Sequence, residues 1–363
     1  MPDRLRVGIV GCGSVAKERH IPGFMKIQNK VTLQATCDSH ESLANDVAKQ
    51  YNMPRVYSDI SEMLTRENLD IVDICTPQQV HAPLTVQALE HGCHVLVEKP
   101  MALQTSACDE MIEASRKSGV KLCVAHNILF HPPFLKAREL MAQGAIGKFT
   151  GMRILISDHR DEMLMRKDYW VHKLPGGLIG ETGPHTVYMS LAFLNQVINI
   201  DVLAKNFLEH SWTPFDEFRI ELEGENAISS IAISYATNRH NCHVDIFGTE
   251  GVLHLNLNSM LLVHEGPRNS LKPIDLARYS LGTAFQITKG VAINAFKVAT
   301  KNVKLGHDVI IEIFVDSILS NQQPPVTGKE GRETVRVMEM IAGKLSAIRR
   351  IEDRQKMEAA PTL

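Results

Sequence analysis

The chain has 363 residues, of which 44% are hydrophobic, and a formal net charge of −2 at pH 7. This length exceeds what one hydrophobic core usually serves, so it predicts two domains. The near-neutral charge, with no block of lysine or arginine, excludes the basic footprint of a nucleic-acid-binding protein. No apolar run approaches the length of a membrane span. We therefore expect a small-molecule partner and neither nucleic acid nor membrane.

The cysteine pattern indicates a reducing compartment. There are seven cysteines, and none stands in a CxxC pair. This usage is typical of packed, reduced thiols rather than of a disulfide framework. The first strand is expected to begin by Leu5, which leaves no room before it for a charged leader and an apolar segment. Together these features predict a cytoplasmic protein.

The first informative stretch is an apolar strand followed by a glycine-rich turn and a helical pattern. Gly11 permits the tight turn, Gly13 lets backbone N–H groups approach phosphate oxygens, and Ala16 stands where helix and strand pack closely. A pyrophosphate would then face the positive end of a helix. A GxGxxA pattern also occurs in ordinary turns, but its place after the first strand favours a dinucleotide. The expected pyrophosphate-binding residues are Gly11, Gly13, Ser14 and Val15.

The second expected strand, residues 31–37, ends on Asp38. A carboxylate at this point can accept hydrogen bonds from both hydroxyls of an adenosine ribose, and its charge opposes a 2′-phosphate. The same carboxylate could cap the next helix, and the two roles are compatible. Ser39 could still accommodate a phosphate, so the sequence favours NAD as cofactor and leaves NADP open.

The β–α alternation continues to residue 125. Helices are expected at residues 14–25, 41–51, 84–91 and 106–117, with another capped by Ser58, and strands near Val56 and at 71–75, 95–97 and 121–125. Short apolar strands separated by helices predict a doubly wound parallel sheet of the α/β class. Residues 1–125 are therefore assigned to an NAD(P)-binding Rossmann domain.

From residue 126 onward the hydrophobic pattern changes to a period of two. The alternating segments are residues 148–157, 218–223, 227–235, 243–247 and 252–257. They predict a large, mostly antiparallel open sheet with helices on one face, in an α+β domain of residues 126–363. Ile228 lies on the face opposite the predicted core, so we expect a homodimer or homotetramer to form through the sheet. We also expect this domain to bind the substrate.

Residues 283–304 predict a long amphipathic helix, with Gly290 inside it. On a helical wheel its lysines gather on one side and its apolar residues on the other. The lysines are Lys297, Lys301 and Lys304, and the apolar residues are Phe285, Ala292, Phe296, Ala299 and Val303. The simplest interpretation is a solvated basic face above a packed apolar one. A subunit contact, an anion-binding edge and weak attachment to a membrane surface are the alternatives.

Three clusters of polar residues are candidates for chemistry. Two follow expected parallel strands, whose carboxyl ends bind ligands in open α/β sheets. They are Thr76-Pro77 with His81, and Glu98-Lys99-Pro100. The third is the glycine-rich segment of residues 176–185 in the second domain, which contains Glu181 and His185.

These motifs resemble the Gfo/Idh/MocA family, which includes glucose-fructose oxidoreductase and inositol dehydrogenase. The most specific element is Glu98-Lys99-Pro100, placed one strand after the segment 76–81. The resemblance runs from the glycine turn with His20-Ile21-Pro22 to residues 328–331. It implies an NAD(P)-dependent oxidoreductase that moves a hydride between the nicotinamide and a secondary hydroxyl of a sugar, cyclitol or nucleotide-sugar.

The resemblance also implies roles for individual residues. It places Lys99 beside the nicotinamide and the substrate hydroxyl, and it makes His185 the catalytic partner. Cofactor contacts are expected from Thr76, Pro77, His81, Glu98 and Lys99, in addition to the glycine turn, Asp38 and Ser39. An ammonium near a carbinol oxygen stabilises a developing alkoxide. The alternative is a surface lysine paired with Glu98.

The pair Gly183-Pro184 predicts a helix whose first position is Pro184, with His185 in its first turn. There the positive end of the helix would keep the imidazole neutral and able to take a proton. Glu181 would orient the ring or bind substrate hydroxyls, and a buried histidine bonded to a carbonyl is the structural alternative.

The sequence departs from the family pattern at Glu181 and Tyr188, where the family often has aspartate, so the substrate pocket is less certain than the hydride machinery. The candidate pocket residues are Asn127, Trp170, His172 and Lys173. No metal site is expected, because His240 and Cys242 share one face of a strand while His243 points to the other.

Two other functions remain open at this point. One is a cofactor-sensing regulator that binds a dinucleotide without turnover. The other is a hydrolase that uses bound NAD transiently to oxidise, eliminate and re-reduce a glycoside.

Overall fold

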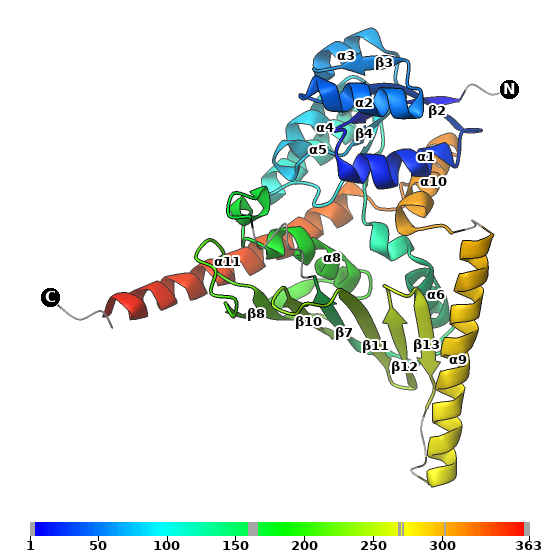
Figure 1. Ribbon diagram of the computed structural model, residues 1–363, viewed down its shortest axis with the longest axis vertical. Coiled ribbons are helices and arrows are strands. Elements are labelled where there is room, and N and C mark those ends of the chain that lie inside the picture. Colours follow the sequence, from blue (N-terminus) through cyan, green and yellow to red (C-terminus); the bar gives the residue numbers. More distant parts are fainter. Residues whose placement is uncertain (1–3, 159–165, 268–269, 271, 301–302, 359–363) are drawn as a thin grey trace. The chain divides into compact units, whose positions relative to one another are not determined.

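The computed structural model describes residues 4–158, 166–267, 270, 272–300 and 303–358 (Figure 1). The chain divides into two compact units. Unit 1 comprises residues 1–130 and 304–336, and unit 2 comprises residues 131–303 and 337–363. Each unit contains one sheet.

The sheet of unit 1 confirms the predicted doubly wound parallel fold. Its strands are β1 (Leu5–Val10), β2 (Val31–Cys37), β3 (Arg55–Tyr57), β4 (Ile71–Ile74), β5 (His94–Val97) and β6 (Leu122–Val124). They are ordered β3-β2-β1-β4-β5-β6, and every pairing is parallel. The strand order reverses direction between β1 and β4, and such a switch point is where open α/β sheets bind ligands.

The helices of unit 1 follow the expected alternation. They are η1 (Ala16–His20), α1 (Ile21–Met25), α2 (Glu41–Tyr51), α3 (Ile60–Arg66), η2 (Gln78–Val80), α4 (His81–Glu90), α5 (Thr105–Ser118), η3 (Asn127–Phe130) and α10 (Gly306–Leu319). The expected cap at Ser58 is wrong, because Asp59 accepts the N–H of Glu62 at 3.0 Å and caps α3. Gly92 and Gly119 end α4 and α5 with φ of 80° and 68°, as the sequence indicates.

Residues 304–336 belong to unit 1. The expected division at residues 125/126 had assigned them to the second domain. α10 packs against α1 and η3. The ammonium of Lys26 lies 2.7 Å from a carboxylate oxygen of Asp308. The apolar stripe of α10 is fully buried at Ile310, Ile311, Phe314 and Val315. Periodicity shows that a helix has a buried face but not which unit buries it.

The sheet of unit 2 confirms the mostly antiparallel prediction. Its strands are β7 (Phe149–Ser157), β8 (Val197–Lys205), β9 (Glu217–Gly224), β10 (Ile228–Ser234), β11 (Asn241–Gly248), β12 (Gly251–Asn256) and β13 (Leu261–Glu265). Their order is β13-β12-β11-β7-β10-β9-β8, and β7 and β10 are parallel while the other pairs are antiparallel. The strands β8 and β13 were not predicted.

The helices of unit 2 are α6 (Pro132–Ala142), η4 (Trp170–Lys173), α8 (Ile179–Leu191) and α9 (Pro273–Ala299). Helix α11 (Gly328–Glu358) begins in unit 1 and continues in unit 2.

The two faces of this sheet differ in burial. Phe218, Ile220 and Ile233 are fully buried on one face. On the other face Leu203 is 73% exposed and Ile228 is 54% exposed. Assembly through this face therefore stays a prediction, and the chain presents apolar side chains there.

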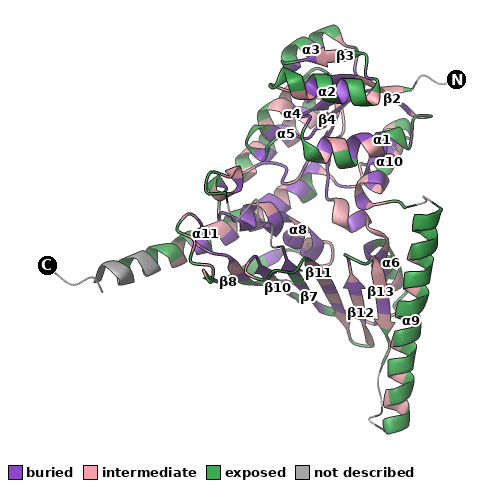
Figure 2. Cartoon of the chain, in the orientation of Figure 1, coloured by how far each residue is buried: buried purple, intermediate pink, exposed green. Residues whose placement is uncertain are grey.

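Helix α9 is continuous through Gly290 and begins earlier than expected, at Pro273. It contains no buried residue, and Figure 2 shows it exposed along almost its whole length. Phe285 and Phe296 are 68% and 70% exposed, so the expected packed apolar face is not observed. Polar groups attach the helix to β13 instead, since the Gln286 side chain bonds both the N–H and the carbonyl of His264. Lys301 lies outside the described residues.

Two expectations about the environment can be compared with the structure. All seven cysteines are free thiols. Within the described residues, no helix combines the length and the hydropathy that a membrane span requires.

The burial of α10 leads to a prediction about stability. Phe314→Ala should lower the free energy of unfolding by about 3–5 kcal/mol, because the side chain is fully buried and its loss leaves a cavity. Ile313→Ala, at a neighbouring side chain that is 39% exposed, is the matched control and should cost distinctly less. Urea unfolding followed by circular dichroism measures both. Equal losses would contradict the placement of α10 in the core of unit 1.

Candidate active site

The glycine turn after β1 has the backbone geometry that the sequence requires of it. Gly11 has φ of +90°, and a Cβ there would lie 2.7 Å from the carbonyl carbon and oxygen of Cys75. A side chain would therefore clash with the main chain that follows β4. The Gly11 N–H also donates to the carbonyl of Cys37 at 2.8 Å, which holds the turn against β2.

The next glycine faces open space. Among the described residues, no atom lies within 4 Å of a Cβ built on Gly13, and both Gly13 and Ser14 are exposed. The helical hydrogen bonds begin here, because the N–H of Lys17 donates to the carbonyl of Gly13 at 3.1 Å. The turn thus leaves room for an anion at a helix N-terminus, as a pyrophosphate requires.

The expected cap of the next helix by Asp38 is wrong, because the N-cap of α2 is His40, whose side chain makes no capping hydrogen bond. Asp38 instead holds the main chain around the glycine turn and keeps capacity for the binding role. One carboxylate oxygen accepts the N–H of Cys12 at 2.8 Å, and the other accepts the N–H of His40 at 2.9 Å. Each oxygen keeps a further lone pair, so contacts to ribose hydroxyls remain available. Ser39 lies beside it, with its hydroxyl 3.4 Å from Nδ1 of His40.

Polar atoms without partners lie just after β4. The Thr76 hydroxyl and both polar atoms of the Gln78 side chain are buried, and none has a hydrogen-bond partner within the described part of the chain. A buried polar group left unpaired costs about 1–3 kcal/mol. These atoms therefore fit a site that a polar ligand completes, and they support a dinucleotide at the switch point. The sequence did not predict a role for Gln78, because a single glutamine carries no pattern of its own.

His81 links two loops. Its Nδ1 lies 2.9 Å from the carbonyl oxygen of Pro100, and its Nε2 lies 2.9 Å from the carbonyl oxygen of Thr76. Burial lowers the pKa of His81, although the two carbonyls oppose the shift. The ring therefore ties the Thr76-Pro77 loop to the Lys99-Pro100 loop, and its expected contact with the cofactor stays a prediction.

Lys99 directly follows Glu98, at the carboxyl end of β5. The Glu98 carboxylate is buried, and its Oε2 accepts the main-chain N–H of Lys99 at 3.0 Å. The main-chain N–H of Glu98 donates to the carbonyl of Ile74 at 3.0 Å, next to the end of β4. The Lys99-Pro100 peptide bond is cis. The main chain is held on one side of Lys99 by the Glu98 carboxylate and on the other by the contact of the Pro100 carbonyl with His81.

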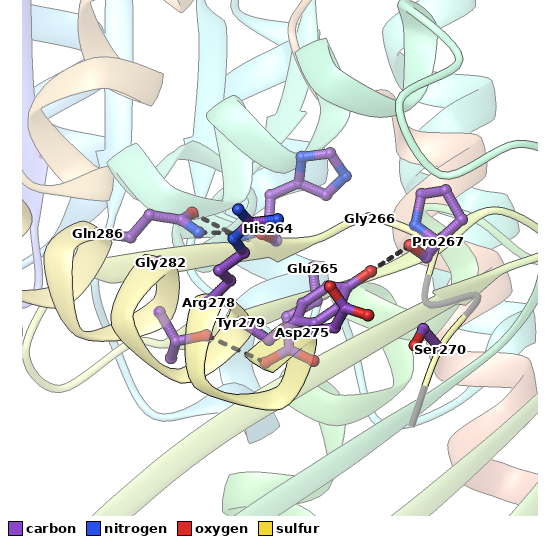
Figure 3. Close-up of a pocket in the computed structure, with 11 residues that line it drawn as sticks. His264, Glu265, Gly266, Pro267, Ser270, Asp275, Arg278, Tyr279, Gly282 and Gln286 are labelled. Carbon is purple, nitrogen blue, oxygen red and sulfur yellow. Dashed lines mark hydrogen bonds between the residues drawn. The ribbon is translucent and has the colours of Figure 1, made fainter. Parts of the chain in front are cut away.

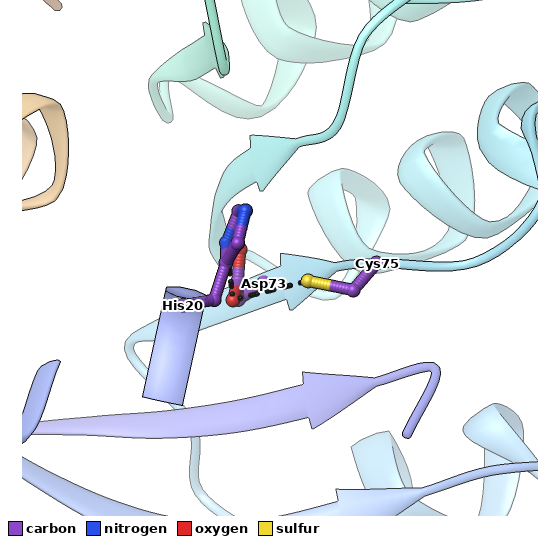
Figure 4. A group of neighbouring side chains, drawn as sticks. All are labelled: His20, Asp73 and Cys75. Atoms are coloured by element: carbon purple, nitrogen blue, oxygen red, sulfur yellow. Dashed lines mark hydrogen bonds and ion pairs between the residues drawn. The ribbon is translucent and has the colours of Figure 1, made fainter. Parts of the chain in front are cut away.

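The other Glu98 oxygen belongs to a buried cluster. Its Oε1 lies 2.8 Å from Nε2 of His20 and 3.4 Å from Nε2 of His307. Figure 4 shows the remaining side of the His20 ring, where Nδ1 lies 3.0 Å from each oxygen of Asp73. The sequence analysis named none of these roles. The signal available was a charged residue, Asp73, inside an otherwise apolar strand.

In unit 2 the position of His185 corrects the expected helix start. α8 begins at Ile179, so Pro184 lies inside the helix and His185 lies near its middle. The argument from the positive end of the helix therefore does not apply. Gly180 and Gly183 allow close packing rather than ending a helix, because a Cβ on Gly183 would lie 2.8 Å from Met338.

His185 has a partner that the sequence did not predict. Its Nδ1 lies 2.7 Å from the hydroxyl of Tyr188, whose side chain is 1% exposed. Tyr188 thus fills the position where the family often has aspartate and orients the imidazole. Glu181 lies one turn before His185, and side chains with this spacing share a helix face.

The candidate pocket residues fall on two elements. Trp170, His172 and Lys173 form η4 in unit 2, whereas Asn127 begins η3 in unit 1. Both ring nitrogens of His172 are shielded from solvent and have no hydrogen-bond partner within the described residues.

Two cavities lie within unit 2. One, of about 490 Å³, lies between β13 and α9, and Figure 3 shows that the residues lining it bond to one another. It contains none of the predicted site residues. The other, of about 570 Å³, is lined by His172 and the glycines just before α8. His210 and Trp212 line it too, with their rings stacked at 4.6 Å.

The opening at Gly13 leads to a prediction about ligand binding. Gly13→Ala should weaken the binding of a dinucleotide such as NADH by about tenfold or more, which is at least about 1.4 kcal/mol. The added methyl meets no protein atom within 4 Å, so the melting temperature should not fall. Gly343→Ala in α11 also meets no atom and is the matched control. Fluorescence titration with NADH measures the affinity. An unchanged Kd for Gly13→Ala would contradict a pyrophosphate site at the glycine turn.

Comparison with known proteins agrees with this geometry. Residues 5–126 match the family described as "Oxidoreductase family, NAD-binding Rossmann fold", and residues 134–254 match the Gfo/Idh/MocA C-terminal domain.

Three curated relatives match parts of the chain. Oxidoreductase P35 of Formosa agariphila is 30% identical over 206 residues, which are 55% of this chain and 64% of that protein. D-glucoside 3-dehydrogenase of Escherichia coli is 35% identical over 40% of this chain and 41% of that protein. A glycosyl hydrolase family 109 protein of Shewanella sp. is 29% identical over 52% of this chain and 45% of its own length. The matches thus span less than two thirds of each of these relatives.

Solved structures share the fold over nearly the whole chain. The WlbA dehydrogenase of Bordetella pertussis, solved with NADH and UDP-GlcNAcA, has a TM-score of 0.78 at 19% identity and covers 95% of this chain and 96% of its own. Levoglucosan dehydrogenase, solved with NADH and levoglucosan, has a TM-score of 0.77 at 18% identity, with 95% and 98% covered. The chain belongs to the Gfo/Idh/MocA family of oxidoreductases and contains its NAD-binding Rossmann domain.

Proposed function

We propose that this protein is an NAD-dependent dehydrogenase that moves a hydride between the nicotinamide and a secondary hydroxyl of a sugar, cyclitol or nucleotide-sugar. The observation that carries the proposal is the fixed main chain of Lys99 at the carboxyl end of β5, in the same sheet as the open glycine turn. The names of the glucoside and levoglucosan dehydrogenases support the substrate class.

Bound NAD would accept or return the hydride. The ammonium of Lys99 is proposed to stabilise negative charge on the reacting oxygen. His185 is proposed to take or return the proton, because the Tyr188 hydroxyl, 2.7 Å from its Nδ1, orients the ring. Glu181 is proposed to bind substrate hydroxyls from the same helix face.

The residues proposed to bind the rest of the substrate are Asn127, Trp170, His172 and Lys173. His172 has two ring nitrogens without partners in the described residues, and it borders the cavity with the stacked pair His210 and Trp212. A sugar offers the hydroxyls and the apolar ring face that such a surface binds.

NAD is proposed in preference to NADP. The Asp38 carboxylate is held by the N–H groups of Cys12 and His40 at the end of β2, so its charge is fixed where a 2′-phosphate would lie. Assembly into a homodimer or homotetramer through the outer face of the unit 2 sheet is proposed from the exposed Leu203 and Ile228.

A second function is favoured by one comparison. One relative is named as a glycosyl hydrolase, which favours the alternative of a hydrolase that would use bound NAD transiently to oxidise, eliminate and re-reduce a glycoside. A glycoside would then be cleaved with no net NADH, and the cofactor would copurify with the protein. Release of sugar at constant NADH absorbance would select this function over the dehydrogenase.

The dehydrogenase is tested directly by a panel of sugars, inositols and nucleotide-sugars assayed with NAD and with NADP. We expect the NADH absorbance band to grow with at least one polyol, faster with NAD than with NADP. Absence of both NADH formation and glycoside cleavage across the panel would overturn the proposal.

The role of Lys99 is tested by substitution in the same assay. Lys99→Met should lower kcat by about 10²–10⁴-fold, because the charge at the reacting oxygen is lost. The Kd for NADH should change little. Lys117→Met, at an exposed lysine in α5, is the control and should leave kcat unchanged. An unchanged kcat for Lys99→Met would refute the assignment.

A further inference from the structure

Four buried ionisable side chains meet beside Lys99, and hydride transfer has no direct use for them. They come from four separate elements of unit 1. His20 ends η1, Asp73 lies on β4, Glu98 follows β5, and His307 lies in the first turn of α10. His20 and Asp73 are fully buried, Glu98 is 6% exposed, and the His307 side chain is 13% exposed. Buried groups of this kind are retained only where their partners compensate the lost hydration.

His20 bridges the two carboxylates. Its Nδ1 is equidistant, at 3.0 Å, from both oxygens of Asp73, and its Nε2 is 2.8 Å from Oε1 of Glu98. An ionised carboxylate only accepts hydrogen bonds, so a ring placed between two of them must donate from both nitrogens. That requires an imidazolium, and charge-assisted bonds of this length are among the stronger ones in proteins.

The other charges around the ring agree with this state. Burial is the largest single influence on His20 and opposes a charge, but Asp73 and Cys75 together outweigh it and raise the pKa of His20 well above its ordinary value. Burial alone would raise the pKa of Glu98, and the bonds from His20 and His307 lower it well below its usual range. Burial lowers the pKa of His307. Burial raises the pKa of Cys75, whose thiol donates to Asp73 at 3.5 Å. The His20 ring thus has a carboxylate within hydrogen-bond distance of each nitrogen, which is the arrangement that favours its charged form.

The cluster reaches Lys99 through Glu98. One oxygen of Glu98 faces His20, while the other accepts the main-chain N–H of Lys99 at 3.0 Å. If the His20 charge were lost, Glu98 would face a second carboxylate without a cation between them. It would then take up a proton or turn away, and the main chain of Lys99 would lose its partner.

We propose that His20 is a positioning residue for Lys99, acting as a permanently charged bridge that orients the Glu98 carboxylate against the Lys99 main chain. This inference rests on the proposed dehydrogenase function for its kinetic readout. The inference adds that one ionic bridge joins Lys99 to η1, the helix after the glycine turn.

A bound divalent cation is the competing explanation, because His20, Glu98 and His307 point donor atoms at one another within 4.8 Å. The 2.8 Å between His20 and Glu98 is shorter than the separation of about 3.3 Å between two ligands of a tetrahedral zinc site. A cation would also have to displace the proton on Nε2. Metal analysis of the purified protein therefore belongs to the test, and stoichiometric metal that is lost in a His20 variant would overturn the proposal.

The kinetic test uses a charge-balanced pair of variants. His20→Gln should lower kcat by about 10–100-fold, the range found for residues that orient a functional group, while KM for NAD changes little. His20→Gln combined with Asp73→Asn removes one anion along with the cation and should regain most of the lost kcat. Asp70→Asn, which breaks the pair with Arg6 just before β4, is the control and should cost stability without lowering kcat. A His20→Gln enzyme with wild-type kcat, or a double variant no better than the single one, would overturn the proposal.

A second readout needs no substrate. The rate of acetylation of the Lys99 amine, measured by mass spectrometry relative to Lys121 in the same sample, should change in His20→Gln and return toward wild type in the double variant. If no polyol is turned over but the Lys99 rate follows this order, the dehydrogenase function fails and the positioning role stands. If kcat is measurable, and both kcat and the acetylation rate are the same in His20→Gln as in the wild type, the positioning role fails while the function stands.

Discussion

The site in unit 1 depends on one buried ionic bridge, the imidazole of His20 between Asp73 and Glu98. Removing one partner of such a bridge typically costs about 3–5 kcal/mol, because an uncompensated charge stays buried. The bridge joins the helix after the glycine turn, the central strand β4 and the end of β5. The ends of these elements are where a Rossmann sheet binds a dinucleotide and where Lys99 begins its turn. In the proposed arrangement, the buried charge of His20 therefore holds the helix after the glycine turn in place relative to the main chain of Lys99.

In unit 2 the candidate histidine, His185, is positioned by packing within and around α8. Gly180 and Gly183 allow Leu174 and Met338 to approach α8 closely, and the helix continues through Pro184. His185 is then oriented by Tyr188 from within the same helix. An exchange of aspartate for tyrosine at this position replaces a charged partner of the imidazole with a neutral one, which would leave less negative charge beside the ring.

Much of the fold followed from sequence alone because local patterns decide it. Glycine turns and short apolar strands predict the parallel sheet, and a period of two predicts most of the second sheet. The strands β8 and β13, which form the two edges of the second sheet, were not predicted. Helix α9 contacts β13 through polar hydrogen bonds rather than through an apolar face. The return of residues 304–336 to unit 1 and the exposed apolar side chains of α9 depend on long-range packing, which no local pattern encodes.

The positions of the candidate site residues in the fold were predicted in part for the same reason. Gly11, Gly13, Asp38 and Lys99 stand in short motifs whose spacing has a physical cause, and the structure places them at the strand ends. His185 was expected at a helix start because Gly-Pro usually marks one, and the close packing of α8 overrode that preference. Asp73 and His307 were not predicted, since a cluster assembled from residues far apart in the chain has no spacing to read.

The charge on His20 is the most direct test of this account. Nitrogen NMR of the protein labelled at histidine reports whether each ring nitrogen of His20 carries a proton. We expect both nitrogens of His20 to stay protonated through neutral and mildly alkaline pH, because each lies within hydrogen-bond distance of a carboxylate. A neutral His20 ring at neutral pH, with one nitrogen unprotonated, would contradict it.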